Sequence, residues 1–304
     1  MRRIFSELVP VAELARHPIL GELRAREIQL LCAVQPEDTG DALRLVERAR
    51  SIGLSIGLWP LVGDADGRWL SRANATQLEE HACLLVERAR PDAIVLDLEP
   101  PISLVRRALR GDLRSILRSS VAQDGARVAS IVRALGASAE VVVTVPPPVL
   151  PGRAGDGFAR AFGIDRLAPG EVTLCPMLYT SLFEGYARGA VRRSDAEALL
   201  GRWARAASGR WGDRACVALG CAGVGALGDE RAWRGLSELE RDIAIASHHV
   251  SDLALFDLAG VLARGEATRW LDTFCDPQFG AAPRTLRASL IDRALRWIGR
   301  ALPR

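Results

Sequence analysis

Eight short apolar runs, each followed by an amphipathic segment, recur along the 304 residues of this chain. Runs of this length, rich in Val, Ile and Leu, are typical of buried strands. Strict alternation of strand and helix favours a parallel sheet, because parallel neighbours need a crossover that is usually a helix. We therefore predict a (β/α)8, or TIM, barrel, with an open doubly wound sheet as the alternative. The runs are 3–9, 28–34, 54–62, 93–100, 140–146, 172–179, 215–221 and 253–260.

No stretch rich in Pro, Gly or Ser divides the chain, so we expect residues 1–304 to form a single barrel domain. The 40 basic and 37 acidic residues nearly balance, which argues against nucleic acid as a partner. No apolar run approaches the roughly 18–20 residues of a membrane span. Because Glu7 and Pro10 interrupt the N-terminal segment, we expect no signal peptide and a cytoplasmic location. The oligomeric state stays open.

The fourth run carries two acids, Asp97 and Glu99, within IVLDLEPP (94–101). Residues two apart on a strand face the same side, and active sites of this barrel gather at the carboxyl ends of its strands. We therefore expect both carboxylates to point into the barrel mouth, where burial and mutual repulsion raise at least one pKa. A raised glutamate pKa suits a general acid at neutral pH. The alternative is a structural pair held by arginines or backbone amides.

The same stretch resembles a motif of a known enzyme family. DAIVLDLE (92–99) is similar to the D-x-x-D-x-D-x-E motif that the family 18 glycoside hydrolases, the chitinase-type barrels, carry on their fourth strand. Asp92, Asp97 and Glu99 match this motif, whereas Val95 stands at the position of its middle acid. By our count the stretch is also the fourth strand of this chain.

Two shorter fragments extend the resemblance. The sixth run ends in MLYT, which is similar to the M-x-Y-D signature on the family's sixth strand; Met177 and Tyr179 match, and Thr180 replaces the acid. The third run is similar to the family's S-x-G-G and keeps Ser55 and Gly57. The order of the strands therefore agrees with the identity of the motifs.

The resemblance implies a glycoside hydrolase in which Glu99 is the general acid. Asp97 would orient the substrate's own acetamido group, which attacks in place of an enzyme nucleophile, and Tyr179 would hydrogen-bond the same group. Cleavage assisted by the substrate is a recognised exception to the two-carboxylate scheme. Because aromatic residues are only 5% of the chain, we expect a small glycoside, N-acetylated as the resemblance implies.

Four further residues are candidates for substrate binding. Trp59 lies near the end of IGLWP (56–60) in the third run and offers a flat apolar face, although a core tryptophan would show the same pattern. Asp92 and Met177 belong to the matched motifs. Asp257 lies within the eighth run, in the area where the family usually places a tryptophan.

Other patterns are weaker. The glycine-rich segment 220–228 begins at the end of the seventh run, a place where many barrels bind phosphate, but it matches no firm phosphate motif, so we favour a turn. His248 and His249 precede the last run, on the side away from the mouth. Six cysteines without paired spacing predict free thiols. We predict no metal and no cofactor.

Several helical patterns complete the chain. Asn74 and Ser194, each followed three residues later by Gln or Glu, predict helix starts. The basic stretch 104–118 suits a solvated outer face, with anionic lipid or acidic partners as the alternative. Residues 285–302 have Leu, Ile and Trp at helical spacing and predict the eighth helix, packed on the barrel.

Two rival functions keep the same fold. One is a barrel that binds sugar without cleaving it, although the retained Glu99 argues against it. The other is an acid/base enzyme that acts on a non-sugar metabolite, which the predicted cytoplasmic location, Val95 and Thr180 favour. Fold alone does not decide among them, because this barrel hosts many chemistries.

Overall fold

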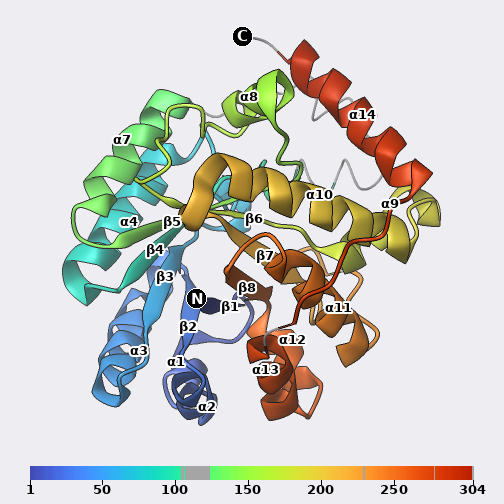
Figure 1. Cartoon of the computed structure of the whole chain (residues 1–304). Helices are drawn as coiled ribbons and strands as arrows, with labels where there is room; N and C mark the ends of the chain where they lie inside the picture. Colours follow the sequence, from blue (N-terminus) through green and yellow to red (C-terminus); the bar gives the residue numbers. More distant parts are fainter. Residues whose placement is uncertain (104–105, 107–123, 229, 277, 303–304) are drawn as a thin grey trace.

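The computed structural model describes residues 1–103, 106, 124–228, 230–276 and 278–302. Eight parallel strands pair in the order β6-β5-β4-β3-β2-β1-β8-β7. Two isolated bridges, Leu174 to Ala215 and Met177 to Ala218, join β6 to β7 and complete the barrel. The predicted (β/α)8 barrel is confirmed (Figure 1). The strands are β1 Arg2–Ser6, β2 Ile28–Val34, β3 Ile56–Pro60, β4 Ala93–Asp97, β5 Glu140–Val145, β6 Thr173–Pro176, β7 Cys216–Gly220 and β8 Asp252–Phe256.

Helices surround the strands as an outer ring (Figure 1). Each buries one apolar face, so a large hydrophobic cluster lies between helices and sheet. The described helices are α1 Val11–Leu14, α2 Ile19–Ala25, α3 Thr39–Ile52, α4 Ala75–Ala89, α7 Gly125–Gly136, α8 Gly152–Ala161, α9 Thr180–Gly189, α10 Arg193–Trp211, α11 Leu236–Ser247, α12 Leu258–Ala263, α13 Ala267–Cys275 and α14 Leu286–Ala301.

The two predicted helix starts differ in their outcome. α4 begins directly after Asn74, as expected, although the Asn74 side chain hydrogen-bonds within the preceding loop and not to the helix. The start at Ser194 is wrong, because α10 already begins at Arg193. Its free amide is that of Arg192, which donates to the Asp195 carboxylate at 3.0 Å. In a capping box, an acid at the third helical position accepts in this way from the backbone amide of the residue before the helix.

A second apolar cluster fills the inside of the barrel, because alternate residues of each strand point inward. At the amino end of the strands this interior is charged. The Arg3 guanidinium is 3% exposed and lies 2.9 Å from Glu140, 3.0 Å from Asp252 and 2.7 Å from the Gln29 amide oxygen. These bonds neutralise the acids that enter the barrel floor.

The segment 285–302 forms a helix as predicted, but it does not pack on the strands. α14 lies outside α8 and α10, at the edge of the helical ring (Figure 1). Leu286, Leu290 and Trp297 face solvent. The expectation that it packs on the barrel is confirmed only in part: Ile291 and Leu295 pack against the large hydrophobic cluster, whereas the buried positions of its inner face are small or polar (Ala288, Asp292 and Gly299).

We expect Arg3→Leu to destabilise the fold by roughly 3–5 kcal/mol, because it leaves buried carboxylates without a counter-charge. Chemical denaturation with urea measures this change. Arg26→Leu is the matched control: Arg26 also pairs with two acids, but these are about half exposed, at 48% and 58%. Its loss should stay below about 1 kcal/mol. Equal losses in both variants would contradict the argument.

Candidate active site

Asp97 and Glu99 lie at the carboxyl end of β4, as predicted. Asp97 is the last residue of the strand and is 4% exposed. Its Oδ1 accepts a hydrogen bond of 2.7 Å from the Thr144 hydroxyl, because Thr144 lies opposite Asp97 on β5. Glu99 follows two residues after Asp97 and is half-buried. The two acids therefore lie at the mouth of the barrel, Asp97 at the end of β4 and Glu99 two residues beyond it.

Both carboxyl groups hold protons more tightly than usual. Burial raises the pKa of Asp97 to about 8; the charge of Glu7 adds to the effect, whereas the Thr144 hydrogen bond and Arg68 oppose it. Burial also raises the pKa of Glu99 well above its usual range, and the charges of Asp97, Glu7 and Glu230 raise it further. A carboxyl group in such surroundings is protonated at neutral pH and is able to donate its proton.

Glu7 and Arg68 form an ion pair at the same mouth. The Arg68 Nε and Nη2 atoms lie 2.9 and 2.8 Å from the Glu7 Oε1 atom, and both side chains are nearly buried. Arg68 also donates to Asp64 at 2.9 Å. Its backbone has φ of +67°, a strained conformation for a residue with a side chain. Sequence reasoning missed this pair, since the partners are 61 residues apart.

Tyr179 contributes to an aromatic wall beside the acids. Its ring stacks on Phe256 at 5.2 Å between centroids, with an interplanar angle of 20°. A Cβ atom on Gly220 would lie 2.9 Å from the Tyr179 ring, so this glycine makes room for the tyrosine. Burial, together with the charges of Cys221 and Glu99, raises the pKa of Tyr179, which keeps its hydroxyl protonated.

Two tryptophans lie in the same interior cluster as Tyr179, and Met177 packs against it. Trp59 points into the barrel and is only 4% exposed; its ring centroid lies 5.6 Å from that of Phe5, with the two rings nearly perpendicular. It therefore forms part of the packed interior beneath the mouth. The indole Nε1 atoms of Trp59 and Trp69 have no hydrogen-bond partner within the described part of the chain.

Asp257 lies directly after β8, at the start of α12. Its Oδ1 accepts a hydrogen bond from the Gly260 amide at 3.0 Å. Its buried Oδ2 has no hydrogen-bond partner among the residues that the structure describes. Burial raises the pKa of Asp257 to about 6, and the charge of Glu230 contributes. Asp257 therefore caps a helix and also borders the acidic mouth.

Asp92 does not join the site, which corrects the expectation that it binds substrate. It precedes β4, so a whole strand separates it from Asp97. Its Oδ2 accepts hydrogen bonds from the Ile56 amide at 2.8 Å and the Ser55 hydroxyl at 3.1 Å. These bonds hold the starts of β3 and β4 together.

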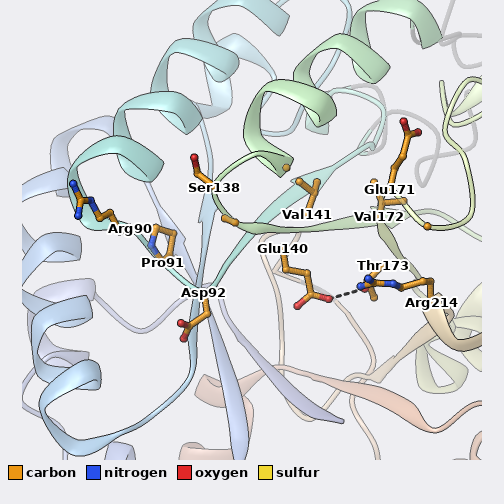
Figure 2. Close-up of a pocket in the computed structure, with 13 residues that line it drawn as sticks. Arg90, Pro91, Asp92, Ser138, Glu140, Val141, Glu171, Val172, Thr173 and Arg214 are labelled. Atoms are coloured by element: carbon orange, nitrogen blue, oxygen red, sulfur yellow. Dashed lines mark hydrogen bonds between the residues drawn. The ribbon is translucent and has the colours of Figure 1, made fainter.

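Figure 2 shows Asp92 in a pocket of about 600 Å³ at the amino ends of β4, β5 and β6. Glu140 also lines this pocket, and its carboxylate accepts a hydrogen bond of 2.6 Å from the Thr173 hydroxyl. In the same pocket Arg90 and Arg214 are the basic residues. The pocket therefore opens at the end of the barrel opposite Glu99.

The glycine-rich segment after β7 forms a loop whose backbone amides bind the nearby Glu230 side chain. The Glu230 carboxylate accepts hydrogen bonds from the amides of Leu227 at 2.8 Å and Gly228 at 2.9 Å. A phosphate group would need backbone amides of this kind. Because the Glu230 carboxylate already accepts from both amides, this loop is more consistent with a structural turn than with a phosphate site.

Thr180, directly after Tyr179, is bound to residues of the neighbouring helices. It begins α9 and is fully buried, where its hydroxyl bonds the Asp242 carboxylate and accepts from Arg193 at 2.9 Å. Asp242 also accepts from the Trp233 indole at 2.8 Å. Thr180 therefore belongs to a polar network that involves α9, α10 and α11.

The remaining predictions concern metals, membranes and partners. Among the described residues, no group of His, Cys, Asp and Glu is arranged to hold a metal ion, and no helix is long and apolar enough to cross a membrane. His248 and His249 lie between α11 and β8, at the amino end of that strand. The basic stretch 104–118 lies outside the described residues except for Arg106, which donates to the Ala226 carbonyl.

Solved structures of other proteins share the fold of this chain. No family model and no curated protein matches the sequence. The catalytic domain of a hyperthermophilic chitinase from Pyrococcus furiosus superposes with a TM-score of 0.52, at 11% identity over 85% of this chain and 84% of that one. A chitinase from Rhizomucor miehei gives the same TM-score at 12% identity, over 90% and 99% of the chains. Such identities show the shared barrel fold alone.

We expect Asp97→Asn to stabilise the protein at neutral and alkaline pH. The folded chain keeps a proton on Asp97 up to about pH 8, whereas the unfolded chain loses it near pH 4, so wild-type stability falls between these values. The variant does not titrate there. Its advantage should therefore grow with pH, by at most about 1.4 kcal/mol per unit. Urea unfolding at pH 4, 6 and 8 measures the difference; a constant difference would contradict the raised pKa.

Proposed function

We propose that this barrel is a glycoside hydrolase that cleaves a small glycoside with Glu99 as its general acid. One observation carries the proposal: Glu99 stands half-buried at the carboxyl end of β4, where burial and three neighbouring carboxylates raise its pKa. Two structural neighbours are chitinases, and we propose an activity of the same kind for this chain. The matching motif on the fourth strand supports the same activity.

In this mechanism Glu99 donates its proton to the glycosidic oxygen as the bond to the sugar's anomeric carbon breaks. The acetamido oxygen of an N-acetylated sugar attacks that carbon, and Asp97 and Tyr179 position the group. Water then opens the cyclic intermediate, with Glu99 as the base that recovers a proton. Two displacements at one carbon give a product with retained configuration.

The environment of Asp97 supports this role despite the missing middle acid of the motif. Val95 points into the barrel two residues before Asp97 and offers no proton. Thr144 supplies a hydroxyl from the neighbouring strand, and its hydrogen bond favours the ionised form of Asp97. We infer that Thr144 orients the Asp97 carboxyl group, the role that the similar motif gives to its middle acid.

The aromatic residues favour a small substrate. Trp59 is packed against Phe5 inside the barrel, so it offers no open platform along which a polymer could lie. Tyr179 and Phe256 form one compact stacked pair beside the acids. A substrate of one or two sugar units suits this arrangement.

We expect Glu99→Gln to lower kcat by about 10²–10⁴, because the amide keeps the shape but has no proton to donate. A panel of chromogenic glycosides and short chito-oligosaccharides, run beside the wild type, measures release. Asp92→Asn is the matched control, since it changes a carboxylate at the other end of β4. Its activity should be unchanged. Release from no sugar, or equal release by Glu99→Gln, would contradict the proposal.

The pH profile provides a second test. A general acid works only while protonated, so kcat/KM falls as pH rises through its pKa. Because the pKa of Glu99 is raised, activity should persist well to the alkaline side of pH 4–5, where an ordinary glutamate ionises. Initial rates between pH 4 and 10 check this expectation. An alkaline limb near pH 5 would exclude Glu99 as the acid in these surroundings.

A further inference from the structure

The C-terminal helix α14 exposes its largest apolar side chains. Trp297 is 73% exposed, Leu286 78% and Leu290 53%. At 100° per residue these three positions fall within about 40° of one another, so they form one stripe along the helix. We call Leu286, Leu290 and Trp297 the α14 stripe. Single exposed apolar residues are common, but an aligned row of large ones marks an interaction surface.

The rotation of α14 is set by its opposite face. A Cβ atom on Gly157 of α8 would lie 1.8 Å from the Gly299 carbonyl oxygen, so the two helices touch backbone to backbone. Arg202 of α10 donates to Ser289 at 2.6 Å, and Asp292 is buried beside Arg296 at 2.8 Å. Together with Ile291 and Leu295, which pack against the large hydrophobic cluster, these contacts hold the opposite side of α14 inward, so the α14 stripe faces solvent.

Basic residues share the exposed face with the α14 stripe. α14 contains four arginines and one acid, Asp292, which is buried. By helical angle, Arg293 and Arg300 lie beside the stripe, both are exposed, and neither has an ion-pair partner among the described residues. The outward face of α14 is therefore both apolar and positively charged.

We propose that α14 docks on the surface of a bilayer that contains anionic phospholipids. The α14 stripe would enter the boundary between headgroups and acyl chains, while Arg293 and Arg300 would contact lipid phosphates. This is how basic amphipathic helices bind membranes without crossing them. A tryptophan suits that boundary because its ring is apolar and its N–H is polar.

A second copy of the chain fits this face less well. In a twofold interface the same patch meets itself. Arg293 and Arg300 would then face their own copies across an apolar contact, with no acid on the exposed face to separate them. A lipid surface supplies the missing negative charge.

Co-sedimentation with vesicles tests the proposal. The wild type should bind vesicles of equimolar phosphatidylcholine and phosphatidylglycerol, and should not bind phosphatidylcholine alone. Arg293→Ala/Arg300→Ala should lower the partition coefficient by roughly 25-fold, about fivefold for each arginine. Leu290→Ala/Trp297→Ala should lower it at least about 10-fold, because it removes most of the stripe's apolar area.

Two exposed arginines elsewhere give the matched control: Arg48→Ala/Arg72→Ala removes the same charge and should keep vesicle binding. All these side chains are exposed, so each variant should keep the wild-type melting temperature. No binding of the wild type, or equal binding by the α14 variants, would overturn the proposal. A dimer that the Leu290→Ala/Trp297→Ala change dissociates, without vesicle binding, would assign the face to a second copy.

Discussion

A closed barrel brings side chains from all eight strands into one interior, where a charge must meet a partner or stay neutral. The two ends of this barrel meet that constraint differently. At the amino end, Arg3 pairs with Glu140 and Asp252. At the carboxyl end, within the described part of the chain, Arg68 is bound to Glu7 while Asp97 and Glu99 keep raised pKa values. The paired charges at the amino end stabilise the fold, whereas the acids at the carboxyl end keep protons bound at the mouth.

Two positions differ from the chitinase-type motif that this chain resembles, and their side chains have different surroundings. Val95 places an apolar side chain in the interior, and Thr144 on the next strand provides a hydroxyl for Asp97. Thr180, in contrast, bonds to Asp242 and Arg193, which lie on α11 and α10. The Thr144 hydroxyl therefore holds Asp97, whereas the Thr180 hydroxyl contributes to the packing of helices. This difference is the reason to base the proposed chemistry on Asp97 and Glu99.

The outer ring shows how close backbone contact directs a surface. Gly157 and Gly299 let α8 and α14 approach until a carbonyl oxygen of one helix fills the space of a side chain on the other. A larger residue at either position would push α14 away and free it to rotate. The exposed α14 stripe is thus a consequence of two glycines more than 140 residues apart in the sequence.

The sequence by itself determined the eight strands, their parallel order and the placement of Asp97 and Glu99 at the end of the fourth, because apolar periodicity is a local property. Even there, the matching Asp92 was misassigned, since a motif does not show that its first and last residues lie at opposite ends of one strand. Only the tertiary structure decided that Glu7, Arg68, Thr144 and Glu230 surround the acid pair. Their positions depend on pairing between strands that are distant in the chain, which no local pattern encodes. The same holds for α14: its helical period predicted a helix, and packing alone chose which face it buries.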